Sequence, residues 1–168
     1  MEFIFLTGFM GSGKSTTGTV LAARIGCPFL DLDRQIEKRE GRSIPDIFST
    51  DGEAGFRRIE CACLRELLDR YGQEQGRLVL SLGGGTLTQP EARALIAGKG
   101  PCIYLRTRPD TVRARLGRGS ADRPLLKEDT LDDLLARREH LGQAAATLTV
   151  DTDGKTPDEL ALLIFYSL

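Results

Sequence analysis

The chain has 168 residues and a mass of 18.4 kDa, the size of one ordinary domain. Hydrophobic residues make up 40% of it and charged residues 28%, a globular composition that argues against a disordered or fibrous protein. Its formal net charge of −1 speaks against a general affinity for nucleic acid.

Short apolar runs alternate with helical patterns from one end of the chain to the other. In chain order, the pattern predicts a strand over 3–7, a helix over 14–25, a strand over 29–32, helices over 34–39, 44–48 and 51–71, a strand over 78–82, a helix over 91–96, a strand over 102–105, helices over 111–116 and 131–146, a strand over 147–150 and a helix over 157–168. Five buried-type strands separated by helices are typical of a parallel sheet covered on both faces. We therefore expect an α/β fold and a single domain over residues 1–168.

The most specific motif lies between the first predicted strand and the first predicted helix. The run Gly8–Thr16 matches the P-loop pattern GxxxxGK[ST] completely. Its glycines let backbone N–H groups turn toward a phosphate, and the N-terminus of the following helix adds a partial positive charge. Lys14 would reach the β- and γ-phosphates, and the Ser15 hydroxyl would bind Mg²⁺. The predicted phosphate-binding residues are Gly11, Ser12, Gly13, Lys14, Ser15 and Thr16.

Two aspartates follow the second predicted strand. The strand over 78–82 ends without a carboxylate, so Asp31 and Asp33 are the nearest candidates for a second Mg²⁺ ligand. Period-two spacing would place both side chains on one side of the strand, toward the edge of the sheet where the P-loop opens. The alternative is that Asp33 caps a helix that begins at Arg34.

Three other segments carry candidate ligand groups. Gly83–Gly85 follow the third strand and can offer backbone N–H donors to a ligand at contact distance, although a flexible turn would have the same composition. Arg57 and Arg58 lie near a predicted helix N-terminus and oppose its dipole, which indicates either a ligand or tolerance at the surface. The polar run 117–126 suits a mobile lid that carries an arginine over the phosphates.

Several functional classes are excluded by what the chain lacks. It contains no asparagine, so neither the guanine-reading NKxD box of GTPases nor the catalytic-loop asparagine of protein kinases is present. No CxxC pair or histidine cluster accompanies Cys27, Cys61, Cys63 and Cys102, so we expect free, buried thiols in a reducing compartment. No apolar run approaches the ~20 residues of a membrane span, and the first residues lack the basic region of a signal peptide. We expect a cytoplasmic monomer without a membrane or nucleic-acid partner.

Together these motifs resemble those of the shikimate kinase family, and the resemblance covers almost the whole chain. The P-loop, Asp-Leu-Asp at 31–33, Gly-Glu-x-x-Phe-Arg-x-x-Glu at 52–60, the triple glycine and Arg-Pro-Leu-Leu at 123–126 occur in the family's order and spacing. The resemblance implies a three-layer P-loop NTPase fold with a five-stranded parallel sheet, a substrate-binding helical region at about 31–61 and a mobile lid at about 115–126. It also implies an enzyme that uses ATP and Mg²⁺ to phosphorylate the 3-hydroxyl of shikimate, in the pathway to chorismate and the aromatic amino acids.

The resemblance assigns roles by position. Arg57 and Arg138 would hold the carboxylate of shikimate, and Asp33 would bind its hydroxyls and accept a proton. The implied substrate-binding residues are Asp33, Arg57, Gly83, Gly84, Gly85 and Arg138. The implied nucleotide-binding residues outside the P-loop are Arg115, Arg123, Lys155 and Pro157. The implied catalytic residues are Lys14, Asp33 and Arg123, with Ser15 as a direct Mg²⁺ ligand and Asp31 as a ligand through water.

One segment departs from the family's pattern. Where the family usually has Pro-Leu-Tyr, Arg138 is followed by Glu139-His140-Leu141-Gly142, so a glycine replaces the tyrosine. This predicts looser packing beside that helix and leaves Arg137 as an alternative to Arg138. Two other functions also stay open: a different small-molecule kinase, such as a gluconate-type or nucleotide kinase, and a P-loop regulator or nucleic-acid-stimulated ATPase.

Overall fold

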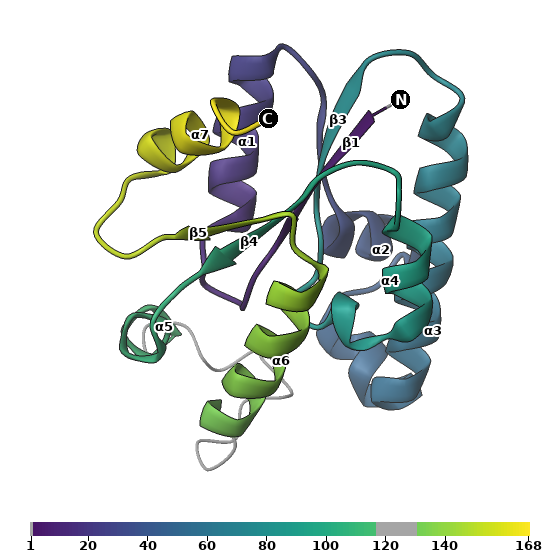
Figure 1. Cartoon of the computed structure of the whole chain (residues 1–168). Coiled ribbons are helices and arrows are strands. Elements are labelled where there is room, and N and C mark those ends of the chain that lie inside the picture. Colours follow the sequence, from purple (N-terminus) through teal and green to yellow (C-terminus); the bar gives the residue numbers. More distant parts are fainter. Residues whose placement is uncertain (1, 117–130) are drawn as a thin grey trace.

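The computed structural model describes residues 2–116 and 131–168. Within these ranges, five strands form one parallel sheet in the order β2-β3-β1-β4-β5 (Figure 1). The strands are β1 (Glu2–Thr7), β2 (Phe29–Asp31), β3 (Arg77–Ser81), β4 (Cys102–Arg106) and β5 (Leu148–Asp151). The predicted five-stranded parallel sheet is confirmed, and every strand begins and ends within one residue of its predicted bounds.

The connections between the strands are helical, as predicted. The helices are α1 (Lys14–Ile25), α2 (Leu32–Glu40), α3 (Ile44–Gly72), α4 (Pro90–Ile96), α5 (Pro109–Leu116), α6 (Leu131–Ala145) and α7 (Pro157–Phe165), with a short 3₁₀ helix, η1, over Thr86–Thr88. The central strand β1 has β3 on one side and β4 on the other. Strands β2 and β3 therefore lie on one side of β1, and strands β4 and β5 lie on the other. Open α/β sheets bind their ligands beyond the carboxyl end of the strand at which the strand order changes sides.

The side chains of β1 alternate between two cores. Phe3 and Phe5 pack on one face of the sheet with residues of α2, α3 and α4. Ile4 and Leu6 pack on the opposite face with residues of α1 and α7. All four side chains are at most 2% exposed, as expected for a central strand with helices on both faces. The layers are visible in Figure 1, with α1 and α7 to the left of the sheet and α3 and α4 to its right.

Helix α3 joins two helices that were predicted separately, over 44–48 and 51–71. The junction is Gly52, whose φ of 67° and ψ of −178° are not helical and fall in a region that favours glycine. The helical conformation is therefore interrupted at Gly52, as the two separate predicted helices imply, and the chain bends there. The longer part of α3, beyond the bend, carries the Gly-Glu-x-x-Phe-Arg-x-x-Glu residues onto the sheet.

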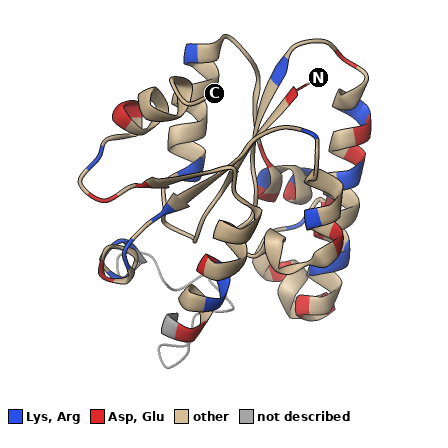
Figure 2. Ribbon diagram, in the orientation of Figure 1, with Lys and Arg blue, Asp and Glu red and all other residues tan. Residues whose placement is uncertain are grey.

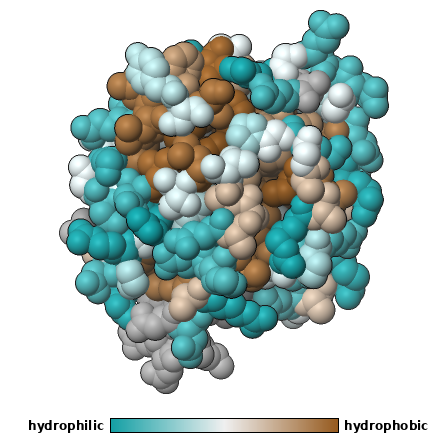
Figure 3. All heavy atoms as spheres, viewed as in Figure 1, coloured by the Kyte–Doolittle hydropathy of each residue, from teal (hydrophilic) through white to brown (hydrophobic). Residues whose placement is uncertain are grey.

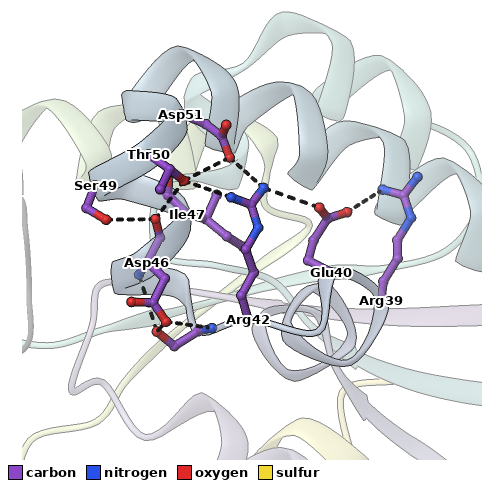
Figure 4. A network of polar contacts seen from close by, with 9 residues as sticks. Arg39, Glu40, Arg42, Asp46, Ile47, Ser49, Thr50 and Asp51 are labelled. Atoms are coloured by element: carbon purple, nitrogen blue, oxygen red, sulfur yellow. Dashed lines mark hydrogen bonds and ion pairs between the residues drawn. The ribbon is translucent and has the colours of Figure 1, made fainter.

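Arg42 closes the corner between α2 and α3. Its guanidinium donates to Thr50 Oγ1 at 2.7 Å and to Asp51 Oδ2 at 2.5 Å, and it lies 3.5 Å from Glu40 (Figure 4). Each of these exposed contacts contributes little alone. Together they hold the residue that precedes the bend at Gly52, and so they define how the two helices meet.

The four cysteines are free thiols, but they are not all buried as predicted. Cys61, Cys63 and Cys102 are buried, whereas Cys27 is half-buried. Burial raises the pKa of Cys63 to about 11 and that of Cys102 to about 12. Both cysteines of α3 are covered because this helix packs against α2 and α4.

Charged residues of both signs are spread over the surface and alternate along α3 (Figure 2). Apolar surface gathers in the upper left of the same view, around α7 (Figure 3). The large apolar side chains that are exposed in the described ranges are Leu162, Leu163, Phe165, Tyr166 and Leu168. None of the helices in these ranges has the length and hydropathy needed to cross a bilayer.

Candidate active site

The P-loop connects the carboxyl end of β1 to the first turn of α1. Gly8, Gly11 and Gly13 have φ values of 148°, 79° and 89°, which side chains disfavour. A Cβ atom at Gly8 would lie 2.6 Å from the carbonyl oxygen of Leu105 and 2.8 Å from Ser12 Oγ. The glycines of the motif are therefore required by the shape of the loop and by its close approach to β4.

Lys14 is the first residue of α1 and folds its side chain back over this loop. Its Nζ donates to the carbonyl oxygens of Gly8 at 2.9 Å and of Phe9 at 3.1 Å. The N-cap of α1 is Gly13, which has no side chain to accept hydrogen bonds from the first turn. An ammonium group and an uncapped helix N-terminus on one loop form a site for an anion such as phosphate.

Ser15 and Asp31 place two oxygen donors together beside the P-loop. The Ser15 hydroxyl donates to Asp31 Oδ2 at 2.6 Å. Hydroxyl and carboxylate oxygens are the kind of ligand that Mg²⁺ prefers, usually together with phosphate oxygens. Among residues 2–116 and 131–168, no group of three or more His, Cys, Asp or Glu side chains is placed to hold a metal ion. Phosphate or water oxygens would therefore have to complete a Mg²⁺ site here.

The expectation that Asp31 and Asp33 lie side by side on a strand is wrong. Strand β2 ends at Asp31 and α2 begins at Leu32, so Asp33 lies in the first helical turn. The alternative that Asp33 caps the helix is also wrong, because Asp31 is the cap and accepts from the backbone N–H of Arg34 at 3.3 Å. The Asp33 side chain is thereby available to the site, and its Oδ1 lies 2.9 Å from where a Cβ atom of Gly83 would be.

The three glycines after β3, Gly83–Gly85, are surrounded by charged side chains. A Cβ atom on the first would lie 2.7 Å from Glu60 Oε1, one on the second would lie 3.7 Å from Arg138 Nη1, and one on the third would overlap the Arg57 guanidinium. None of the three has a positive φ. They are needed for space rather than for an unusual backbone conformation, because they let polar groups from several helices reach one stretch of backbone.

Arg57 is held by a buried ion pair within α3. Its Nη1 donates to Glu60 Oε2 at 2.7 Å, and Glu60 Oε1 accepts from the Thr86 hydroxyl at 2.5 Å. Arg57 is 7% exposed and Glu60 is fully buried, while Nε of Arg57 has no acceptor among the described residues. Glu60 belongs to the quoted sequence motif, but its role was not predicted. The available signal is its spacing, because residues three apart face each other on a helix.

Arg138 comes from α6 and approaches the same glycines. It is 7% exposed, its Cζ lies 5.2 Å from the ring centroid of Phe9, and its Nε has no acceptor in the part of the chain that the structure describes. Burial, and secondly the positive charge of Arg57, lowers the pKa of Arg138 to about 10. Arg137, the alternative from the sequence, is exposed. Two buried guanidinium groups with unused donors thus converge, an arrangement that suits a carboxylate.

Asp33 lies among groups of both signs. Burial raises the pKa of its carboxyl to about 6, an effect that the positive charge of Lys14 opposes and the negative charge of Asp31 reinforces. A carboxyl group whose pKa is near neutrality, within a cluster of charged side chains, is a candidate for accepting a proton during a reaction.

The expectation of loose packing beside Gly142 is wrong. The ring of Tyr104, from β4, lies against the backbone of α6 at this glycine, and a Cβ atom there would lie 2.6 Å from Tyr104 Cδ2. Both residues are buried. An aromatic side chain therefore does fill this space, but it comes from the sheet instead of from the helix.

The residues predicted to bind the nucleobase lie further along the same edge of the sheet. Arg115, in α5, donates from Nη1 to the carbonyl oxygen of Gly11 at 2.8 Å, so it contacts the P-loop. Lys155 is exposed in the loop between β5 and α7, and Pro157 is the first residue of α7. Arg123 and residues 117–126 of the predicted lid lie outside the described residues, and their roles stay predictions.

Asp153 ties the loop after β5 to α5, a role that the sequence did not reveal because its partners come from another element. Its Oδ2 accepts from the backbone N–H of Arg108 at 2.9 Å, and its Oδ1 accepts from the Thr111 hydroxyl at 2.5 Å. A hollow of about 640 Å³, large enough for a nucleobase, is lined by Asp110, Thr111, Ala114 and Arg115.

Replacing Glu60 with alanine should lower the free energy of unfolding by about 3 kcal/mol, because the buried charge of Arg57 would lose its hydrogen-bonded partner and keep only the exposed carboxylate of Glu53, at 3.5 Å. The matched control is Glu66→Ala on the same helix. Glu66 pairs with Arg39 at 2.9 Å in a more exposed position, where an ion pair contributes at most about 1 kcal/mol. Urea denaturation followed by circular dichroism measures both losses. Equal losses in the two variants would contradict the prediction.

Comparisons with known proteins point to one family. A family model described as shikimate kinase matches residues 10–168. The shikimate kinase of Thermus thermophilus is 43% identical over 164 residues, which cover 94% of this chain and 85% of that protein. A solved shikimate kinase from Acinetobacter baumannii, in complex with shikimate, has a TM-score of 0.90 and 37% identity, and the match covers 99% of this chain and 92% of that one.

The same scaffold occurs in kinases of other small molecules. A solved gluconokinase from Sinorhizobium meliloti has a TM-score of 0.59, with 99% of this chain and 92% of that chain covered. Its sequence is only 18% identical, so this likeness concerns the fold alone.

Proposed function

Because the chain belongs to the shikimate kinase family, we propose that it transfers the γ-phosphoryl group of ATP to the 3-hydroxyl of shikimate. The products would be ADP and shikimate 3-phosphate. The observation that carries the proposal is the convergence of Arg57, Arg138 and Asp33, from three different helices, on Gly83–Gly85 beside the P-loop. Two arginines and a carboxyl group beside a loop for phosphates are what a kinase of a hydroxylated carboxylic acid requires.

In this proposal the two buried arginines bind the shikimate carboxylate. The pair Arg57–Glu60 holds one guanidinium in place, and the ring of Phe9 supports the other, that of Arg138. Asp33 would accept hydrogen bonds from the substrate hydroxyls, and the backbone N–H groups of Gly83–Gly85 would approach the substrate closely because no side chains intervene. This set distinguishes a hydroxylated carboxylic acid from a nucleoside monophosphate.

We also propose that ATP and Mg²⁺ bind at the P-loop. The adjacent Ser15 and Asp31 oxygens fit a hard cation, with Ser15 as a direct ligand and Asp31 as a ligand through water. Mg²⁺ bound there would neutralise part of the negative charge on the phosphates. The nucleobase would lie toward Arg115, Lys155 and Pro157.

The chain's own residues would act mainly by positioning and by charge. Phosphoryl transfer passes through a loose transition state, so the strength of the base matters less than the alignment of the hydroxyl. Asp33 would orient the 3-hydroxyl and accept its proton late in the reaction. Lys14, together with Arg123 as the family resemblance implies, would stabilise negative charge on the transferring oxygens.

The value of kcat/KM for shikimate should fall about tenfold for each unit of pH below 6. The pKa of Asp33 is raised to about 6, so the carboxylate form dominates above this pH and the protonated form below it. Only the carboxylate can accept a proton, and kcat/KM reports ionisations of the free enzyme. Steady-state kinetics between pH 5 and 8 measure the profile, with Asp33→Asn expected to lack this acid limb. A wild-type profile that stays flat to pH 5 would contradict the assignment.

The test of the proposed function is ADP release from Mg·ATP with and without shikimate. Gluconate and nucleoside monophosphates serve as control acceptors. ADP production that depends on shikimate, and that the controls do not elicit, supports the proposal. ADP release with gluconate but not with shikimate would favour a gluconate-type kinase on the same fold.

A further inference from the structure

Strand β4 and helix α6 meet at a contact with no spare room. Tyr104 is 5% exposed, and its ring packs directly on the backbone of α6 at Gly142, where a Cβ atom would lie 2.6 Å from Cδ2 and 3.3 Å from Cζ. The cavity bordered by these two residues, Phe9 and Arg138 has a volume of about 10 Å³, no more than a single water needs. A methyl group at Gly142 would therefore not fit, and the ring of Tyr104 has no free space into which it could rotate.

The same side of α6 carries Arg138. Residues four apart lie above one another on a helix, so Gly142 and Arg138 share one face. One turn from the contact with Tyr104, the guanidinium of Arg138 reaches the ring of Phe9 and comes within 3.7 Å of where a Cβ atom of Gly84 would be. The distance of α6 from the sheet therefore determines how far Arg138 extends into the site.

We propose that Tyr104 and Gly142 are positioning residues for the reaction. The contact between the ring of Tyr104 and the backbone of α6 at Gly142 sets the distance of α6 from the sheet, and this distance places Arg138 for the carboxylate of the acceptor. The inference rests on the proposed function and deepens it, because it identifies residues that determine the specificity for the acid through the position of Arg138. Tyr104 and Gly142 act through Arg138.

The physical size of the effect follows from contact distances. Carbon atoms that are not bonded approach to about 3.5–4.0 Å, so a Cβ atom at 2.6 Å requires a displacement on the order of 1 Å. A misplacement of this size can lower the efficiency of a positioned group by about 100-fold. Alanine otherwise favours a helix over glycine by about 1 kcal/mol, so the substitution helps the helix locally while it harms the site.

The test compares Gly142→Ala with Gly72→Ala. Gly72 is the last residue of α3, and a Cβ atom there would have nothing within 4 Å. Gly142→Ala should raise KM for shikimate at least tenfold and leave KM for ATP within twofold, whereas Gly72→Ala should change neither. An equal rise of both KM values, or no rise for shikimate, would overturn the proposal.

Changes at Tyr104 give a second and independent arm. Tyr104→Val removes the ring and should raise KM for shikimate, whereas Tyr104→Phe keeps the ring and should not. In the double variant Gly142→Ala with Tyr104→Val, the methyl group occupies the space that the ring has left, so KM should rise by less than the product of the two single effects. Effects that simply multiply would overturn the proposal. If Gly142→Ala fails to fold, the comparison of Tyr104→Val with Tyr104→Phe still decides, because an unchanged KM for shikimate in Tyr104→Val would overturn it.

Failure of this inference can be told apart from failure of the proposed function. Calorimetric titration of the wild-type protein with shikimate tests the proposed function alone. Crystal structures of the wild type and of Gly142→Ala show the position of α6 relative to the sheet without any substrate. A displaced α6, with Arg138 drawn away from Phe9, supports the inference even if shikimate does not bind. An α6 in the same position in both structures overturns it.

Discussion

Replacing Lys14 with alanine should reduce kcat by about 10³-fold or more while the protein remains folded. The ammonium group of Lys14 lies on the P-loop, bonded to the carbonyl oxygens of Gly8 and Phe9. Cations that are positioned in advance stabilise the charge that spreads over the phosphate oxygens in the transition state. Alanine leaves the loop without this charge, so the loss should fall on turnover more than on the binding of shikimate.

The control for Lys14→Ala is Lys38→Ala, which removes an equal charge from the exposed surface of α2. ADP release at saturating shikimate measures kcat for both variants, and circular dichroism checks that both are folded. Lys38→Ala should match the wild type. If Lys14→Ala kept kcat within tenfold of the wild type, Lys14 could not be the group that contacts the transferring phosphate.

The second large effect is expected at Arg57. Arg57→Ala should raise KM for shikimate by about 10²- to 10³-fold, because the shikimate carboxylate would lose one of its two proposed guanidinium partners. Truncating one partner of a buried, hydrogen-bonded charge pair across a binding interface costs about 2–5 kcal/mol. The binding of ATP should survive, since Arg57 lies on α3 against Gly85 and Glu60 and not on the P-loop. Initial rates over a range of shikimate concentrations, with ATP affinity from calorimetry, separate the two effects.

Arg58 provides a neighbouring control for Arg57. It follows Arg57 in α3 but is exposed, so Arg58→Ala should leave KM for shikimate close to that of the wild type. Arg57→Lys keeps the positive charge but loses the planar fork that binds a carboxylate through two donors, so its KM should lie between those of alanine and arginine. An unchanged KM in Arg57→Ala would remove Arg57 from the carboxylate site.

The two arginines differ in how they are held, and this difference bears on specificity. Glu60 and Thr86 fix Arg57 through hydrogen bonds within a buried network. Arg138 depends on packing against Phe9 and on the position of α6. The carboxylate of the substrate would therefore bind one guanidinium fixed by hydrogen bonds, that of Arg57, and one positioned by helix packing, that of Arg138. Variants that change the packing around Arg138 should alter which acid is bound while they destabilise the fold less than variants of the Arg57 network.

The strands could be predicted from the sequence because continuous apolar runs bounded by glycine, proline or polar residues leave little choice of position. The start of α2 could not. Strand β2 has three residues, and its last residue, Asp31, is also the helix cap, so the apolar pattern contains no sign of where one element ends. The interruption of α3 could be predicted to within a few residues, since the two helices expected over 44–48 and 51–71 meet beside Gly52, although the φ of this glycine could not.

Much of the candidate site could be predicted because Lys14 and Ser15 begin α1 and Asp31 ends β2, at the edge of the sheet where ligands of α/β proteins bind. The contacts that orient them were harder to foresee. The packing of Tyr104 on Gly142 joins a strand and a helix that no local pattern connects. Such contacts depend on the three-dimensional fit of side chains, which spacing along the chain does not encode.

The cysteines make it possible to follow local opening of the folded protein by chemical labelling. The chain has no tryptophan, but a thiol reagent reacts only with an accessible thiolate. With the pKa of Cys63 at about 11, its thiolate is about one part in 10³ at pH 8, and burial shields it further. Cys61 and Cys63 lie in α3, whereas Cys102 begins β4. The order in which these thiols react therefore separates the opening of the substrate-side helix from the opening of the sheet.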